Sequence, residues 1–117
     1  MTDFPGYYEQ LKTLMGELGA DIPDTMNGFK SLHQGSLLEG SLDTKQKELI
    51  ALGIAISVRC NGCIAFHVSA ALNAGASRQE ITETIGVSIL MGGGPSMIYG
   101  LEALEAVKQF SAAEQAA

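Results

Sequence analysis

Cysteine and positive charge are both scarce in this chain. Only two of the 117 residues are cysteines, too few for the disulfide framework of a small secreted domain. Seven basic residues stand against thirteen acidic ones, and the resulting net charge of -6 repels phosphate backbones and anionic lipid surfaces. We therefore expect no binding to nucleic acid or to membranes, and we expect the partners to be small molecules or proteins.

Long apolar runs are also missing. The most apolar segment, residues 49–58, is too short to span a bilayer. The N-terminus has neither the basic start nor the apolar stretch of a secretory signal, so we expect a cytoplasmic protein in a reducing environment. A chain of 117 residues has room for one hydrophobic core, and residues 1–117 are expected to form a single domain.

No segment shows the alternation of polar and apolar residues that is typical of a half-buried strand, so the expected fold class is all-α, with six helices. The expected helix starts are Asp3 with Pro5, Pro23, Asp43 or Thr44, Cys60, a capping box of Ser77 and Glu80, and Pro95. The expected helix ends are Gly19, Gly40, residue 58, Gly75 and residues 92–94, and the tail from Ser111 is expected to fray.

The expected helices carry much apolar surface. The second is expected to bury Met26, Phe29, Leu32 and Leu37. The third is apolar on every side over residues 49–58, which predicts that it is buried all round. The fifth and sixth add Ile81, Ile85, Ile89, Ile98, Leu101 and Leu104. Because large exposed apolar patches are unusual on soluble monomers, we expect a homo-oligomer with closed symmetry.

Both cysteines lie in one short motif, Cys60-x-x-Cys63, with His67 four residues beyond the second cysteine. Such a pair at a helix start can close a disulfide within one turn, and the helix N-terminus stabilises a thiolate there. His67 would lie one turn after Cys63, within reach of a proton transfer. Taken singly, Cys63 and His67 also fit a small buried residue and a core histidine, but the spacing of the two cysteines favours redox chemistry.

Glu48 is the last charged residue before the apolar segment and lies twelve residues before Cys60. A solvated carboxylate in the first turn of a helix is the simpler interpretation. In two straight antiparallel helices joined at Cys60, the helical rise places Glu48 roughly 18 Å and His67 roughly 10 Å from the connection. A direct contact between them requires the earlier helix to end early or the connection to bend, so spacing alone does not predict that contact.

The pattern of Glu48, eleven intervening residues and then Cys60-x-x-Cys63-x-x-x-His67 resembles the signature of the alkyl hydroperoxidase D-like proteins, in the carboxymuconolactone decarboxylase superfamily. The resemblance covers roughly residues 30 to 110. It implies an all-α fold with a thiol peroxidase site. In that site Cys63 would meet the peroxide, Cys60 would resolve it, and His67 and Glu48 would act in a proton relay.

This chain departs from the family pattern at two points. Alkyl hydroperoxidase D itself has a further relay histidine just before the second cysteine, where this chain has Gly62. That protein also holds two related helical halves, whereas this chain is expected to hold a single helical unit. Shorter members of the family assemble as rings, so the resemblance implies a hexamer, with a trimer as the alternative, and a cysteine site near a subunit boundary.

The predicted function is a thiol-dependent peroxidase or disulfide reductase that needs no metal or organic cofactor. The expected substrate is a hydroperoxide, and the expected reductant is a dithiol such as a lipoyl group or a thioredoxin-like protein. Two alternatives stay open. One is a decarboxylase or isomerase of a small lactone acid that uses His67 and Glu48, and the other is a zinc site built from Cys60, Cys63, His67 and a carboxylate. His33 is interpreted as a solvated or packing histidine.

Overall fold

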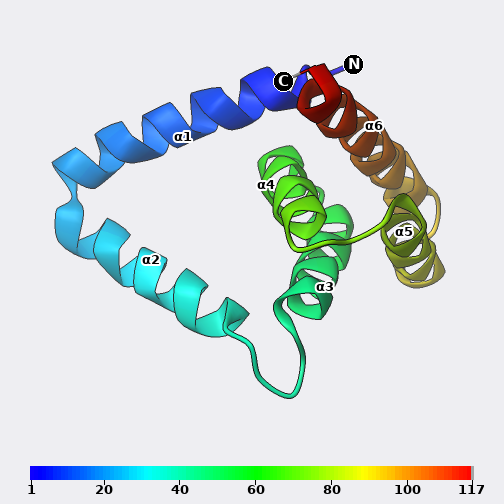
Figure 1. The fold of residues 1–117 in the computed structure, drawn as a ribbon, viewed down its shortest axis with the longest axis horizontal. Coiled ribbons are helices and arrows are strands. Elements are labelled where there is room, and N and C mark those ends of the chain that lie inside the picture. Colours follow the sequence, from blue (N-terminus) through cyan, green and yellow to red (C-terminus); the bar gives the residue numbers. More distant parts are fainter. Residues whose placement is uncertain (117) are drawn as a thin grey trace.

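The structure, a computed structural model, describes residues 1–116, and every regular element in that range is an α-helix (Figure 1). The helices are α1 (Phe4–Asp21), α2 (Pro23–Leu37), α3 (Thr44–Ser57), α4 (Asn61–Asn73), α5 (Arg78–Gly92) and α6 (Gly94–Ala116). The all-α prediction is confirmed. The predicted fraying of the tail is wrong for residues 111–116, which continue α6, and Ala117 lies outside the described residues.

Local chemistry sets most of the helix limits. The Asp3 side chain caps α1 by accepting a hydrogen bond from the Gly6 N–H, and capping boxes open α3 (Asp43 with Gln46) and α5 (Ser77 with Glu80). These contacts satisfy N–H groups that have no partner within their helix. After α4, Gly75 adopts a φ of +94°, a conformation that favours glycine. These predicted limits are confirmed.

The core lies where α3, α4, α5 and α6 pack together with the first turn of α1. Its largest fully buried side chains are Phe4, Leu52, Ile56, Ile64, Ile81 and Val68. Two hydrogen bonds through the Gln109 side chain hold the N-terminus against α6, one accepted from the Phe4 N–H and one donated to the Thr2 carbonyl. As a result α1 is fixed at its start, beside α4 and α6 (Figure 1).

The second half of α1 and all of α2 form an open arm that extends away from the core (Figure 1). Within the chain α2 contacts α1 and, less extensively, α3, and none of its residues is buried. The prediction that α2 buries its apolar residues is therefore wrong for the single chain. Phe29 is 52% and Leu32 65% exposed, while Met26 and Leu37 are half-buried. Among residues 1–116, the contacts of α2 with the other helices leave most of this apolar face exposed.

The prediction that the third helix is buried all round is also wrong for the single chain. Leu52 and Ile56 face the core, but Ile50 and Ile54 are 50% and 58% exposed, since α4 and α5 cover only part of the circumference of α3. The exposed side chains continue onto α5 as Val87 and Met91. We call Ile50, Ile54, Val87 and Met91 the α3–α5 strip; they line one apolar groove. Among residues 1–116, no helix has both the length and the apolar character needed to cross a bilayer.

Candidate functional site

The connection between α3 and α4 is a tight turn over residues 58–60. Arg59 adopts a left-handed φ of +62°, and the Cys60 N–H donates to the Ala55 carbonyl at 3.1 Å. The Arg59 N–H donates to the Ile56 carbonyl at 3.2 Å, which completes the hydrogen-bond pattern of a Schellman helix end. A left-handed conformation costs a non-glycine residue roughly 1–2 kcal/mol. In this conformation α4 begins at once and packs along α3.

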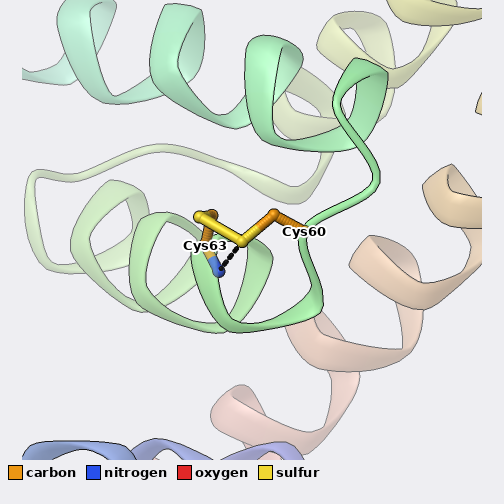
Figure 2. Close-up of a disulfide and its surroundings, with 2 residues drawn as sticks. All are labelled: Cys60 and Cys63. Carbon is orange, nitrogen blue, oxygen red and sulfur yellow. Dashed lines mark hydrogen bonds between the residues drawn. A yellow bond between two sulfur atoms is a disulfide. The ribbon is translucent and has the colours of Figure 1, made fainter.

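Cys60 is the N-cap of α4, and a disulfide joins it to Cys63 in the first turn of that helix (Figure 2). Their Cα atoms lie 5.2 Å apart, within the range of protein disulfides. The Cys60 sulfur also accepts a hydrogen bond from the Cys63 N–H at 3.2 Å. Both residues are partly exposed. After reduction, the N-terminus of α4 would favour the thiolate form of Cys63.

Glu48 and His67 are in direct contact, with 2.7 Å between Glu48 Oε2 and His67 Nδ1. The contact requires the earlier helix to end before Cys60 or the connection to bend. Helix α3 ends at Ser57 and is followed by a short turn, so this condition is met. Glu48 lies nine residues before Ser57, and His67 lies six residues after Asn61. The two backbones therefore differ in level by only about 4.5 Å, a distance that the glutamate side chain spans.

Because Glu48 is buried, its carboxylate depends on the hydrogen bond to His67. Glu48 is 3% exposed, so its interpretation as a solvated carboxylate is wrong. A buried carboxylate is costly unless it is hydrogen-bonded, and His67 supplies that bond. When Glu48 is ionised its carboxylate only accepts, so His67 Nδ1–H is the donor, and in a neutral His67 the acceptor nitrogen is then Nε2. Since His67 lies one helical turn after Cys63, this nitrogen can exchange a proton near the cysteine.

Position 62 is covered by α1. A Cβ atom built on Gly62 would lie 3.2 Å from Leu11 Cδ1 and 3.4 Å from the Tyr7 hydroxyl, both tight distances. A side chain at position 62 therefore requires the ends of the Leu11 and Tyr7 side chains to shift. The same geometry brings the Tyr7 hydroxyl beside the cysteine motif. Sequence reasoning missed this neighbour, because a contact between residues more than fifty positions apart leaves no local pattern.

His33 also lies next to the site. Its ring is nearly parallel to that of His67, with 18° between the planes and 6.3 Å between the centroids, and the Phe29 ring lies 6.4 Å from the His33 ring. The interpretation of His33 as a solvated or packing residue did not anticipate this neighbour. The two histidines come from α2 and α4, and only the packing of the arm brings them together.

The zinc alternative gains no support from the arrangement. Within the described part of the chain, no three side chains of His, Cys, Asp or Glu gather as metal ligands would. The sulfurs of Cys60 and Cys63 are bonded to each other instead.

Residues 23–106 match the model of the carboxymuconolactone decarboxylase family, and the chain belongs to this family. An uncharacterized protein from Cupriavidus necator is 35% identical over 103 residues, which cover 88% of this chain and 91% of that protein. A second relative, an uncharacterized protein of the cox locus of Paracoccus denitrificans, is 33% identical over 81% of this chain and 83% of its own length. The resemblance inferred from Glu48 and the cysteine motif is confirmed at the level of the family.

Solved structures of the family share the fold. A carboxymuconolactone decarboxylase family protein from Legionella pneumophila superimposes with a TM-score of 0.90 at 42% identity, covering 92% of this chain and 96% of that one. A family member from Thermotoga maritima, for which an involvement in antioxidative response has been suggested, superimposes with a TM-score of 0.74 at 27% identity. That match covers 80% of this chain and 96% of the Thermotoga chain.

Proposed function

We propose that this protein is a thiol-dependent peroxidase or disulfide reductase. The observation that carries the proposal is the position of the Cys60–Cys63 disulfide at the start of α4, one helical turn before a histidine whose Nδ1 is bonded to a buried carboxylate. Once a donor has reduced the disulfide, the two thiols can supply two reducing equivalents, and the His67–Glu48 pair supplies a proton acceptor beside them.

In the first step, His67 Nε2 takes the proton of the Cys63 thiol. The thiolate attacks the distal oxygen of a hydroperoxide, so that an S–O bond forms and the O–O bond breaks. The departing alkoxide takes the proton from His67 and leaves as an alcohol, while Cys63 becomes a sulfenic acid. Glu48 holds the imidazole in one orientation and stabilises its charged form during this step.

In the second step, Cys60 attacks the sulfur of the Cys63 sulfenic acid. The S–S bond forms, the S–O bond breaks, and the hydroxyl group leaves as water with the proton of Cys60. A dithiol donor, such as a lipoyl group or a thioredoxin-like protein, then reduces the disulfide by exchange and restores both thiols. Partly exposed Cys60 is the proposed point of attack.

The test is a thiol count on fully reduced protein before and after one equivalent of cumene hydroperoxide. We expect both thiols to disappear and one equivalent of cumyl alcohol to form. The variant with both cysteines changed to serine is the control and should form no alcohol. Two free thiols after the treatment would contradict the proposal.

A second candidate function is decarboxylation or isomerisation of a small lactone acid, which fits the name of the family. The His67–Glu48 hydrogen bond favours it, because an oriented imidazole can act as acid and base without any thiol. Turnover of 4-carboxymuconolactone by the variant with both cysteines changed to serine would support this function. Turnover that is lost in that variant, or absent in the native protein, would argue against it.

A further inference from the structure

A cavity of about 520 Å³ lies between α1 and α2, with Phe66 of α4 on its wall. Its size is in the range of small-molecule sites, roughly 300–1,000 Å³. The side chains around it are mostly apolar or uncharged: Met15, Met26, Asn27, Phe29, Gln34 and Phe66. The arm formed by α1 and α2 is therefore hollow on the side that faces the core.

The charge of this lining differs from that of the chain as a whole. No aspartate or glutamate lines the cavity, whereas Lys30 and His33 do, in a chain whose net charge is -6. A local excess of positive charge beside apolar walls suits a ligand that is both apolar and anionic.

Two glycines of α1, Gly16 and Gly19, also line the cavity and have no side chains that could fill it. A Cβ atom on Gly16 would meet no atom within 4 Å, and one on Gly19 would meet only Met26 Cβ at 3.9 Å. Glycine weakens a helix interior relative to alanine, and neither position needs it to avoid a clash within the chain. The space along α1 is therefore available to a ligand.

Two lining residues of the cavity are neighbours of the cysteine site. Phe66 follows Cys63 by three residues on α4, which makes the two side chains neighbours on one face of that helix. His33, another lining residue, has its ring 6.3 Å from that of His67. A ligand that contacts both Phe66 and His33 therefore lies against side chains that neighbour Cys63 and His67.

We propose that this cavity binds a hydroperoxide that carries a carboxylate on an apolar body. The apolar body lies between Met15, Phe29 and Phe66, and Lys30 pairs with the carboxylate. The peroxide group points toward His33 and Cys63. This substrate class rests on the proposed peroxidase function, while the binding of an apolar carboxylate to the cavity can be measured without any peroxide.

The experiment titrates the full-length disulfide form with decanoate and with decanol, below their aggregation limits, by isothermal calorimetry. We expect decanoate to bind more tightly than decanol. Lys30→Gln should weaken decanoate about fivefold and leave decanol unchanged, because it removes one partly exposed ion pair. Lys108→Gln, on exposed α6 surface, is the matched control and should bind both compounds as the native chain does.

A second variant tests the location. Gly16→Leu adds a side chain that points into open space, so it should fill the cavity without unfolding α1 and should reduce decanoate binding at least tenfold. Gly35→Leu, at an equally open position of α2 outside the cavity, should bind decanoate normally. Equal binding by both variants, or absence of decanoate binding to the native chain, would overturn the proposal. The proposal would also be overturned if Gly16→Leu lowered the mass of the assembly and left decanoate binding unchanged. A second copy of the chain would then be the occupant of the cavity.

The proposed peroxidase function and the proposed ligand site can be rejected independently of each other. Decanoate binding that depends on Gly16 and Lys30, together with no consumption of any hydroperoxide by the reduced protein, would leave the binding site standing and reject the peroxidase function. Consumption of cumene hydroperoxide without decanoate binding would do the reverse.

Discussion

Glu48 Oε2 and His67 Nδ1 lie 2.7 Å apart although nineteen positions separate the residues in the sequence. The Glu48 side chain is 4% exposed and the His67 side chain is 20% exposed, so the glutamate is the more deeply buried partner. A tight turn at Arg59 makes this contact, because it returns the chain along α3 without a loop. The turn therefore positions both the Glu48–His67 pair and the Cys60–Cys63 disulfide.

Glu48→Gln should slow peroxide consumption by about a hundredfold, since the amide cannot stabilise a protonated His67 as the carboxylate does. The pH–rate profile should also move to higher pH, because the proton acceptor beside Cys63 is weakened. Stopped-flow measurement on reduced protein between pH 5 and pH 9 checks both. Glu39→Gln, on the exposed loop before α3, is the control. An unchanged profile in Glu48→Gln would reduce the pair to a structural contact.

The two cysteines should differ in their roles. Cys63→Ser should abolish peroxide consumption, because Cys63 shares a face of α4 with His67. Cys60→Ser should keep one reactive thiol and accumulate a sulfenic acid at Cys63, since no resolving thiol remains. Mass spectrometry after trapping with dimedone distinguishes the two variants. If Cys63→Ser were the variant that retained a trappable sulfenic acid, the assignment would be reversed.

The ion pair between Lys45 and Glu80, at 2.8 Å, should make stability depend on pH at both extremes. The hydrogen bond from Lys45 lowers the pKa of the Glu80 carboxyl below its ordinary value, and the same bond raises the pKa of Lys45. The contribution of Glu80 is thus present above its unfolded pKa and lost as pH falls through the lower folded one. The contribution of Lys45 is present below its unfolded pKa and lost as pH rises through the higher folded one.

A melting experiment checks this pH dependence. Lys45→Gln should melt at a slightly lower temperature than the native chain at neutral pH, and the difference should vanish near pH 2 and above about pH 12. Lys108→Gln, whose partner Glu105 lies 3.9 Å away on the same helix, should show a smaller difference at neutral pH. A difference for Lys45→Gln that stayed constant from acid to alkaline pH would rule out the ion pair as its source.

The exposed apolar faces predict a homo-oligomer, because a soluble monomer seldom leaves so much apolar surface in water. The family resemblance favours a hexamer. Light scattering after size exclusion should give a mass several times the 12.3 kDa of one chain. Val87→Glu, in the α3–α5 strip, should lower that mass, since a carboxylate is costly to bury in a subunit contact. Gln10→Glu, on the exposed side of α1, should not. A native mass near one chain would show that these faces need no partner.

The sequence predicted the helices well, because their limits depend on neighbours within a few residues. Asp3, the Ser77–Glu80 box and Gly75 act through local hydrogen bonds or backbone conformations, whereas α1 and α2 end at Asp21 and Leu37 and not at the predicted Gly19 and Gly40. It predicted burial less well. Phe29 and Ile54 have the apolar character of core residues, but whether a neighbouring helix covers them depends on tertiary packing.

The site divides in the same way. The spacing of Cys60 and Cys63 by itself determined that a disulfide can close at a helix start, and their resemblance to a family singled out His67 and Glu48. Only the tertiary structure decided that Glu48 meets His67, that His33 stands beside them and that Tyr7 covers Gly62. The physical reason is that local patterns fix hydrogen bonds within one helix. Contacts between α1, α2, α3 and α4 depend instead on where each helix ends and how it packs.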